Sequence, residues 1–225
     1  MTQLKLAIGI PAYGGRVVAE HARMFLEIGH TLALSHGRFH LVSSGYLDVC
    51  RVDRARNELL FAAVRAHADW LLMIDADTWV VSAGDEDAGY QLLRMISEAD
   101  RAGAAIVGAP VIRRRAGGEA REITAYRYPH DRPYSEREPW IPPAALSDSE
   151  VREELQEVDA LGTAVFAVNL NRTGGVLFRF TDDFGEDLEY CRQVKQIRGG
   201  KILLDGRVRT AHLSRPYPLL SKEDE

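Results

Sequence analysis

The chain has 225 residues, enough for one sizeable core but short for two independent domains. Hydrophobic residues make up 46% of it and charged residues 27%, the usual balance of a globular protein in water. The net charge of −5 argues against a nucleic-acid-binding protein, because such proteins carry a basic surface. No apolar run approaches the roughly 20 residues of a membrane-spanning helix. With two widely spaced cysteines and no signal-peptide pattern, the sequence predicts a cytoplasmic protein.

The first half of the chain alternates between expected strands and expected helices. Short apolar runs indicate buried strands at residues 4–10, 39–44, 70–74 and 104–112. Apolar residues at helical spacing indicate helices between these strands, at residues 17–34, 54–67 and 90–102. Asp53 is expected to cap the second helix, and Pro110 to bend or break the fourth strand. The alternation predicts a single α/β domain with a mostly parallel sheet flanked by helices.

The second half is less regular. The pattern predicts a strand at 123–128, a long Pro-rich loop at 129–149, a short acidic helix at 148–157, a strand within 158–170, a helix at 183–198 and a strand at 201–204. A loop as long as this one is typical of an active-site lid or of a disordered segment.

The segment at residues 68–78, Ala-Asp-Trp-Leu-Leu-Met-Ile-Asp-Ala-Asp-Thr, is the strongest indication of function. Asp75 and Asp77 follow its apolar run, and on a strand two such side chains would point in the same direction. Ligands of open α/β sheets bind at the carboxyl ends of the strands. Because two neighbouring carboxylates repel each other without a cation, we expect a divalent metal and a nucleotide diphosphate here. Asp85 and Asp87 repeat the spacing without a preceding strand, which predicts a solvated loop.

A second cluster at an expected helix start consists of Arg51, Arg54, Arg56 and Asn57. Guanidinium groups there can bind phosphate together with the free N–H groups of the helix. The alternative is a solvated helix end in which Asp53 pairs with one of the arginines.

Glu186 and Asp187 form a third cluster, at the start of a later helix. One of them could be a general base, although the helix dipole alone also favours acidic residues at this position. Gly185 would leave room for a substrate beside them. His212, after the last expected strand, could be a third metal ligand, although a lone histidine can equally be structural.

Taken in order, these residues resemble a GT-A-fold glycosyltransferase of the family 2-like type. The matching segments are Ile-Pro-Ala-Tyr at 10–13, Arg-Ala-Arg-Asn at 54–57, residues 68–77, Gly-Thr-Ala at 162–164, Gly-Glu-Asp-Leu-Glu at 185–189 and His212. No single motif is specific, but the order and spacing of the motifs together are. The resemblance extends over nearly the whole chain. The resemblance implies a nucleotide-binding half (1–112) and an acceptor and catalytic half (113–212) of one domain, with a mobile loop at 129–149 and a tail at 213–225.

The resemblance also implies a role for each residue. The nucleotide-diphosphate sugar donor would be bound by Pro11, Ala12, Tyr13, Arg54, Arg56, Asn57, Asp75, Gly162 and Thr163. Mn²⁺ or Mg²⁺ would be held by Asp75, Asp77 and His212. Asp187, or second to it Glu186, would take the proton from the acceptor hydroxyl. A Gln-x-x-Arg-Trp motif is absent, which implies transfer of one sugar rather than polymer synthesis.

Two other functions stay open at this point. A sugar nucleotidyltransferase has a related sheet, and Gly14-Gly15-Arg16 is compatible with one, although its longer Gly-rich loop is replaced here by Pro11 and Tyr13. A non-catalytic nucleotide-sugar-binding module is the other. Relatives with a similar metal-binding histidine retain the anomeric configuration, so the stereochemistry is open as well. The acceptor (a small molecule, a glycan or a protein), the nucleotide and the sugar are not indicated.

Overall fold

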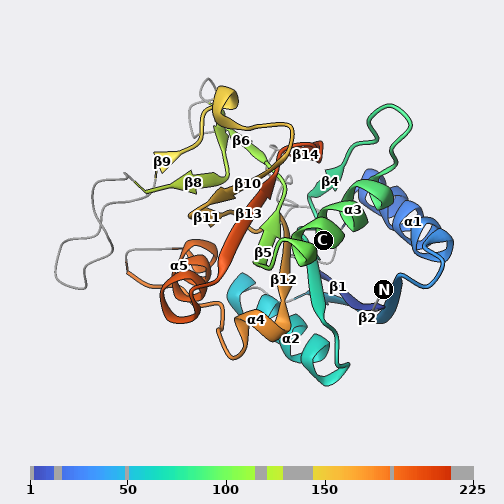
Figure 1. The fold of residues 1–225 in the computed structure, drawn as a ribbon, viewed down its shortest axis with the longest axis horizontal. Coiled ribbons are helices and arrows are strands. Elements are labelled where there is room, and N and C mark those ends of the chain that lie inside the picture. The colour runs from blue at the N-terminus through green and yellow to red at the C-terminus, as the bar shows by residue number, and fades with distance from the viewer. Residues whose placement is uncertain are drawn as a thin grey trace, which may run out of the picture.

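A seven-stranded sheet separates two layers of helices in the computed structural model of the protein (Figure 1). The structure describes residues 3–12, 17–48, 51–114, 121–128, 144–182 and 185–213. Tyr13, residues 129–143 of the expected lid and residues 214–225 of the expected tail lie outside these ranges.

The strands of the central sheet point mostly in one direction. Their order in space is β10 (Leu155–Val158), β13 (Lys201–Asp205), β5 (Ala104–Gly108), β12 (Val165–Asn169), β3 (Trp70–Ile74), β1 (Leu4–Ala12) and β2 (Phe39–Asp48). β1 is parallel to β2 and β3, and β5 is parallel to β13. β12 is antiparallel to its neighbours β3 and β5, and β10 is antiparallel to β13. The predicted mostly parallel sheet is confirmed, with one reversed strand in its interior.

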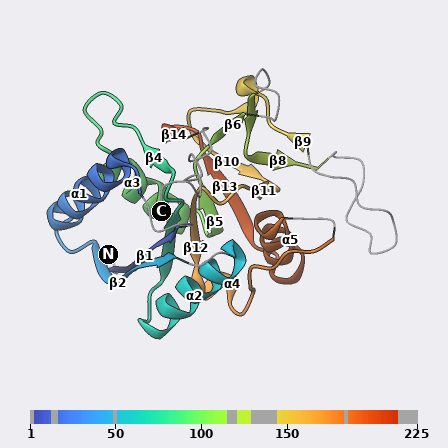
Figure 2. The ribbon, with the colours of Figure 1, turned by 180° about the vertical axis from the view of Figure 1, so that it is seen from behind.

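Helices cover both faces of this sheet (Figures 1 and 2). One layer contains α1 (Ala19–Leu34) and α3 (Ala88–Arg101), and the other contains α2 (Val52–Arg65), α5 (Glu186–Arg198) and the short α4 (Leu170–Thr173). Along β3, Trp70 and Leu72 join the core under α1 and α3, whereas Leu71 and Met73 join the core under α2 and α5. Because both faces of β3 are buried, its sequence is a continuous apolar run.

Smaller sheets extend the domain beyond one edge of the central sheet. They pair β4 (Thr78–Val80) with β14 (Thr210–His212), β6 (Ile112–Arg114) with β7 (Arg121–Ile123), and β8 (Ala125–Arg127) with both β9 (Ala144–Ala145) and β11 (Ala160–Leu161). The strand predicted over 104–112 is interrupted between β5 and β6, at Pro110, as expected. In the part of the chain that the structure describes, no helix has the length and apolar character needed to cross a bilayer.

Two predictions about helices were wrong. The acidic stretch expected to be a helix over 148–157 is a 3₁₀ turn at Asp148–Glu150 followed by β10. β10 pairs with β13 and buries Gln156 and Val158, so tertiary pairing decides its conformation. Asp53 does not cap α2, because the helix already begins at Val52. The Asp53 carboxylate instead pairs with Arg51 at 2.7 Å.

Asp87 and His212 lie where the sequence predicts, but each has an additional structural role. Asp87, in the loop before α3, caps that helix, with its carboxylate accepting from the Tyr90 N–H at 2.7 Å. His212 follows the strand predicted at 201–204 and lies within a further short strand, β14.

Gly89 marks the place where α1 and α3 approach most closely. A Cβ atom added there would lie 2.5 Å from the Glu27 carbonyl oxygen and 2.6 Å from Thr31 Oγ1. We therefore expect Gly89→Ala to lower the free energy of unfolding by about 1–3 kcal/mol, because overpacking forces the helices apart. Gly29→Ala is the matched control, since its Cβ would meet nothing within 4 Å. There the helix propensity of alanine should raise stability by about 0.5–1 kcal/mol, and urea unfolding of both variants tests the contrast.

Candidate active site

Several of the predicted site residues lie at the carboxyl ends of the parallel strands of the central sheet, here called the carboxyl edge. The register of β1 and β3 pairs Gly9 with Met73, which places Pro11 level with Asp75. The reversed direction of β12 brings its start to the same edge, and the Asp75 N–H donates to the Ala164 carbonyl at 3.0 Å. Pro11 and Ala12 are buried there, as are Gly162 and Thr163 just before β12.

Asp75 and Asp77 do not lie on the strand, which was the premise for expecting them to point in the same direction. β3 ends at Ile74, and the Thr78 N–H donates to the Asp75 carbonyl at 2.9 Å, closing a turn from β3 into β4. The two carboxylates consequently reach different partners. Asp75 turns toward α2, and Asp77 turns toward β14.

Arg56 joins three elements at this edge. It belongs to the start of α2, and its side chain is 2% exposed. One guanidinium nitrogen, Nη2, donates to Asp75 Oδ1 at 2.8 Å, and the other, Nη1, donates to Glu186 Oε1 at the start of α5. The buried guanidinium of Arg56 therefore provides positive charge beside Asp75, and Glu186 pairs with the same guanidinium.

Burial and the neighbouring charges together raise the pKa of Arg56, Asp75 and Glu186. Burial alone would lower the pKa of Arg56, but the Asp75 and Glu186 carboxylates outweigh burial and raise it. Burial raises the pKa of Asp75, against the opposing effect of Arg56 and with the repulsion of Asp77 and Asp187 added. Burial also raises the pKa of Glu186, again opposed by Arg56. Asp75 and Glu186 thus share a single guanidinium, and the charge of Asp187 acts on it as well.

Glu186 and Asp187 have different environments at the start of α5. Glu186 is buried against Arg56, whereas Asp187 is half-buried, with its Oδ1 accepting from the Leu188 N–H at 2.8 Å. A Cβ at Gly185 would lie 3.0 Å from Asp187 Oδ1, so this glycine makes room for the Asp187 carboxylate itself. Of the two acids, Asp187 is the more exposed, and its role as the base stays a prediction.

Asp77 and His212 face each other across the β4–β14 pair. His212 Nε2 lies 3.4 Å from Asp77 Oδ2, and the side chains are 25% and 36% exposed. Burial would raise the pKa of Asp77, but the hydrogen bond and charge of His212 lower it. Within the described ranges, no group of three or more His, Cys, Asp or Glu side chains is arranged to hold a metal ion. The Asp77 carboxylate is a type of ligand that suits Mn²⁺ or Mg²⁺, whereas the His212 imidazole is not a typical ligand of Mg²⁺, and a metal at this pair stays a prediction.

The remaining members of the second cluster serve the fold or face solvent. Asn57 holds the chain before α5, because Nδ2 donates to the Phe178 carbonyl at 2.8 Å and the Phe178 N–H donates to Oδ1 at 2.9 Å. Arg54 is exposed. That Arg54, Arg56 and Asn57 contact a nucleotide stays a prediction, as do the metal and base roles.

Sequence reasoning missed that Arg56 is a buried ion-pair centre. The signal was present, since Arg56, Leu59, Leu60 and Ala63 follow the spacing of a single helix face and all four are buried. An arginine on the apolar face of a helix must find carboxylates in the interior. Glu189 on α5 was missed in the same way; it is 1% exposed and pairs with both Arg179 and Arg192.

Known families and curated proteins give no match to this sequence. Solved structures do share its fold. A197 from STIV superposes with a TM-score of 0.53 at 13% identity, over 93% of this chain and 86% of A197. UDP-glucose pyrophosphorylase, solved in its apo form, superposes with a TM-score of 0.50 at 10% identity, over 95% of this chain and 93% of that protein.

A third structure aligns more weakly. Residues 1–349 of S. aureus TarS, solved in complex with UDP, give a TM-score of 0.47 at 11% identity, over 89% of this chain and 57% of that one. Identities this low establish a common fold and no common activity. The sheet order, the two helical layers and the superposition on UDP-glucose pyrophosphorylase together confirm the predicted fold, a single α/β domain of the GT-A type.

Proposed function

We propose that the protein is a metal-dependent glycosyltransferase that moves one sugar from a nucleotide-diphosphate sugar to an acceptor hydroxyl. The observation that carries the proposal is the pair of bonds from buried Arg56 to Asp75 and Glu186. These bonds hold the end of β3 and the start of α5 together, at the edge of the sheet where ligands of open α/β folds bind. Asp77 and His212 lie on one side of this junction, and Asp187 lies next to Glu186.

In this proposal, the acidic residues have separate tasks. Asp187 accepts the proton of the acceptor hydroxyl as its oxygen bonds to the anomeric carbon, and the nucleotide diphosphate leaves with the electron pair of the broken bond. Glu186 remains bonded to Arg56 and fixes the start of α5, so that the Asp187 carboxylate stays in place. This assignment supposes an inverting reaction; with retention, Asp187 would not be a simple base.

Asp77 and His212 would hold the cation. Bound Mn²⁺ or Mg²⁺ supplies positive charge that stabilises the departing diphosphate. The contact between Asp77 and His212 holds the two groups close together across the β4–β14 pair. Asp75, whose Oδ1 is bonded to Arg56, would complete the set or contact the ribose.

A sugar nucleotidyltransferase is the second candidate. It is favoured by the superposition on UDP-glucose pyrophosphorylase, which extends over 93% of that protein. Such an enzyme would release pyrophosphate from a nucleoside triphosphate and a sugar phosphate, whereas a glycosyltransferase releases a nucleoside diphosphate. The two reactions therefore give different products from the same site.

The test is product analysis over a panel of nucleotide sugars with Mn²⁺, with and without acceptors. We expect nucleoside diphosphate from the wild-type protein. Asp77→Ala should require at least about tenfold more Mn²⁺, because even changes behind a metal ligand weaken metal affinity about 10–100-fold. Asp148→Ala, which alters an exposed aspartate on a 3₁₀ turn, should leave the Mn²⁺ dependence unchanged.

Other products would point to other functions. Pyrophosphate from a nucleoside triphosphate and a sugar phosphate would identify the nucleotidyltransferase instead. Binding of a nucleotide sugar without turnover, across donors and acceptors, would identify a binding module. An Asp77→Ala protein with an unchanged Mn²⁺ requirement would remove Asp77 from the metal site.

A further inference from the structure

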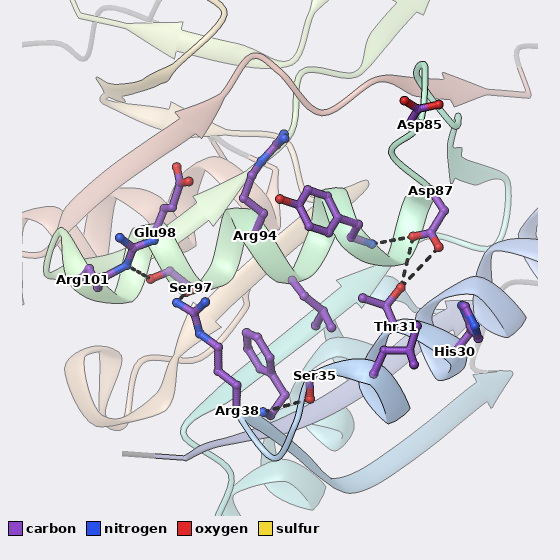
Figure 3. A pocket seen from close by; sticks show the side chains of 14 residues that line it. His30, Thr31, Ser35, Arg38, Asp85, Asp87, Arg94, Ser97, Glu98 and Arg101 are labelled. Carbon is purple, nitrogen blue, oxygen red and sulfur yellow. Dashed lines mark hydrogen bonds between the residues drawn. The ribbon is translucent and has the colours of Figure 1, made fainter. Parts of the chain in front are cut away.

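A cavity of about 500 Å³ opens between α1 and α3, on the helical layer opposite α2 and α5 (Figure 3). Its walls come from the second half of α1, the start of β2, α3 and the loop before α3. None of its lining residues is among those predicted for the active site. Phe39 and Leu93 form a buried apolar floor, and the volume lies within the range of about 300–1,000 Å³ that is usual for small-molecule sites.

Two arginines meet at one end of this α1–α3 cavity. Arg38 donates to the hydroxyl of Ser97, and Arg101 Nε donates to the carbonyl of the same serine at 3.3 Å. Ser97 is 3% exposed, so both guanidinium groups are anchored to a fixed point on α3. Neither arginine pairs with a carboxylate in the part of the chain that the structure describes, and nearby Glu98 bonds to Arg207 at 2.5 Å. Two like charges held together attract an anion, and guanidinium groups match the geometry of phosphate.

Carboxylates lie at the other end of the α1–α3 cavity (Figure 3). The Asp87 carboxylate already accepts hydrogen bonds within the protein, from the Tyr90 N–H and from the Thr31 hydroxyl at 3.1 Å. Asp85 has no hydrogen bond or ion pair to any described residue, and its carboxylate is available to accept from a ligand hydroxyl. Tyr90 also lines the cavity and is 50% exposed, and the Arg94 guanidinium lies over its ring, 5.8 Å from the ring centre.

We propose that the α1–α3 cavity binds a small phosphorylated sugar. The phosphate lies against Arg38 and Arg101, the sugar hydroxyls donate to Asp85, and the sugar ring packs against Tyr90. A dicarboxylate fits less well, because its second charge would meet Asp85. A cationic peptide fits less well, because Arg38 and Arg101 would repel it.

The first experiment measures the affinity of the full chain for glucose 6-phosphate by titration calorimetry, without metal. We expect saturable binding that is tighter than the binding of inorganic phosphate. The double variant Arg38→Gln/Arg101→Gln should bind at least about tenfold more weakly, because hydrogen bonds to charged groups are lost. Arg65→Gln, at the exposed end of α2 on the other layer, is the matched control and should bind as the wild type does.

A second pair of measurements locates the sugar and separates this cavity from the sheet-edge site. Asp85→Asn should weaken glucose 6-phosphate binding and leave inorganic phosphate binding unchanged. Asp77→Ala should leave both unchanged, whether or not the protein proves to be a glycosyltransferase. If the double variant does not fold, as judged by circular dichroism, Arg101→Gln alone serves in its place.

The proposal is overturned if wild-type protein does not bind glucose 6-phosphate at millimolar concentration. Binding that survives loss of the arginines would also overturn it, as would binding that is abolished by Asp77→Ala. Equal affinities for inorganic phosphate and glucose 6-phosphate would show that no sugar is recognised.

Discussion

Arg56→Met is expected to lower the free energy of unfolding by about 3–5 kcal/mol, the usual result of breaking a buried ion pair from one side. Asp75 and Glu186 both bond to this guanidinium, and its removal leaves two carboxylates beside each other without a counter-charge. Methionine replaces the aliphatic part of the arginine side chain and has no charge, so the variant removes the guanidinium and both of its ion pairs. Urea unfolding followed by circular dichroism measures the change.

Two further variants separate charge from shape in the Arg56 experiment. Arg54→Met replaces an exposed arginine on the same turn and should change stability by less than about 0.5 kcal/mol. Arg56→Met combined with Glu186→Gln should recover part of the loss, because one of the two uncompensated carboxylates becomes neutral. If Arg56→Met alone costs less than about 1 kcal/mol, Arg56 does not hold the edge of the sheet together.

Asp187→Asn is expected to slow sugar transfer by about 10²–10⁴-fold, the range by which a positioned general base accelerates a reaction. Asparagine keeps the shape of the side chain and can still accept from the Leu188 N–H, so stability and donor affinity should be preserved. Single-turnover transfer measures the rate, and titration with the nucleotide product measures binding.

The control for this experiment is Asp182→Asn, an exposed position shortly before the helix, which should transfer at the wild-type rate. Glu186→Gln should behave differently from both, with lower stability, because Arg56 then keeps only Asp75 as a charged partner. A full transfer rate in Asp187→Asn with unchanged donor binding would contradict the assignment of Asp187 as the base.

The fold could be predicted from sequence where burial on both sides of a strand leaves a continuous apolar run. β3 matches the predicted residues 70–74, because every residue of that strand is buried. The helix predicted at 148–157 was wrong because long-range pairing outweighed the local preference. Its residues are acidic and favour a helix locally, but Gln156 and Val158 gain burial by pairing with β13, which lies far along the chain.

Which residues form the site stays a prediction, and the contacts among them could not be read from the sequence. The sequence indicated that Asp75, Asp77, Glu186 and His212 meet at one edge, but it did not indicate which group neutralises which. Arg56 bonds to a residue 19 positions away and to another 130 positions away, and such contacts follow only from the packing of α2 and α5 against the sheet. The apolar run marked the end of β3 at Ile74, but it did not indicate the turn that follows, and this turn decides the directions of Asp75 and Asp77.

The reversed strand β12 has a consequence for how the protein is made. β3 and β5 are consecutive strands of the central sheet along the chain, yet in the folded sheet β12 separates them and pairs with both. Until residues 165–169 leave the ribosome, each of these two apolar strands has an unpaired edge that can associate with other chains. Closing this gap requires a pairing of high sequence separation, which slows folding. The nascent chain therefore depends on its last third to protect its first half from aggregation.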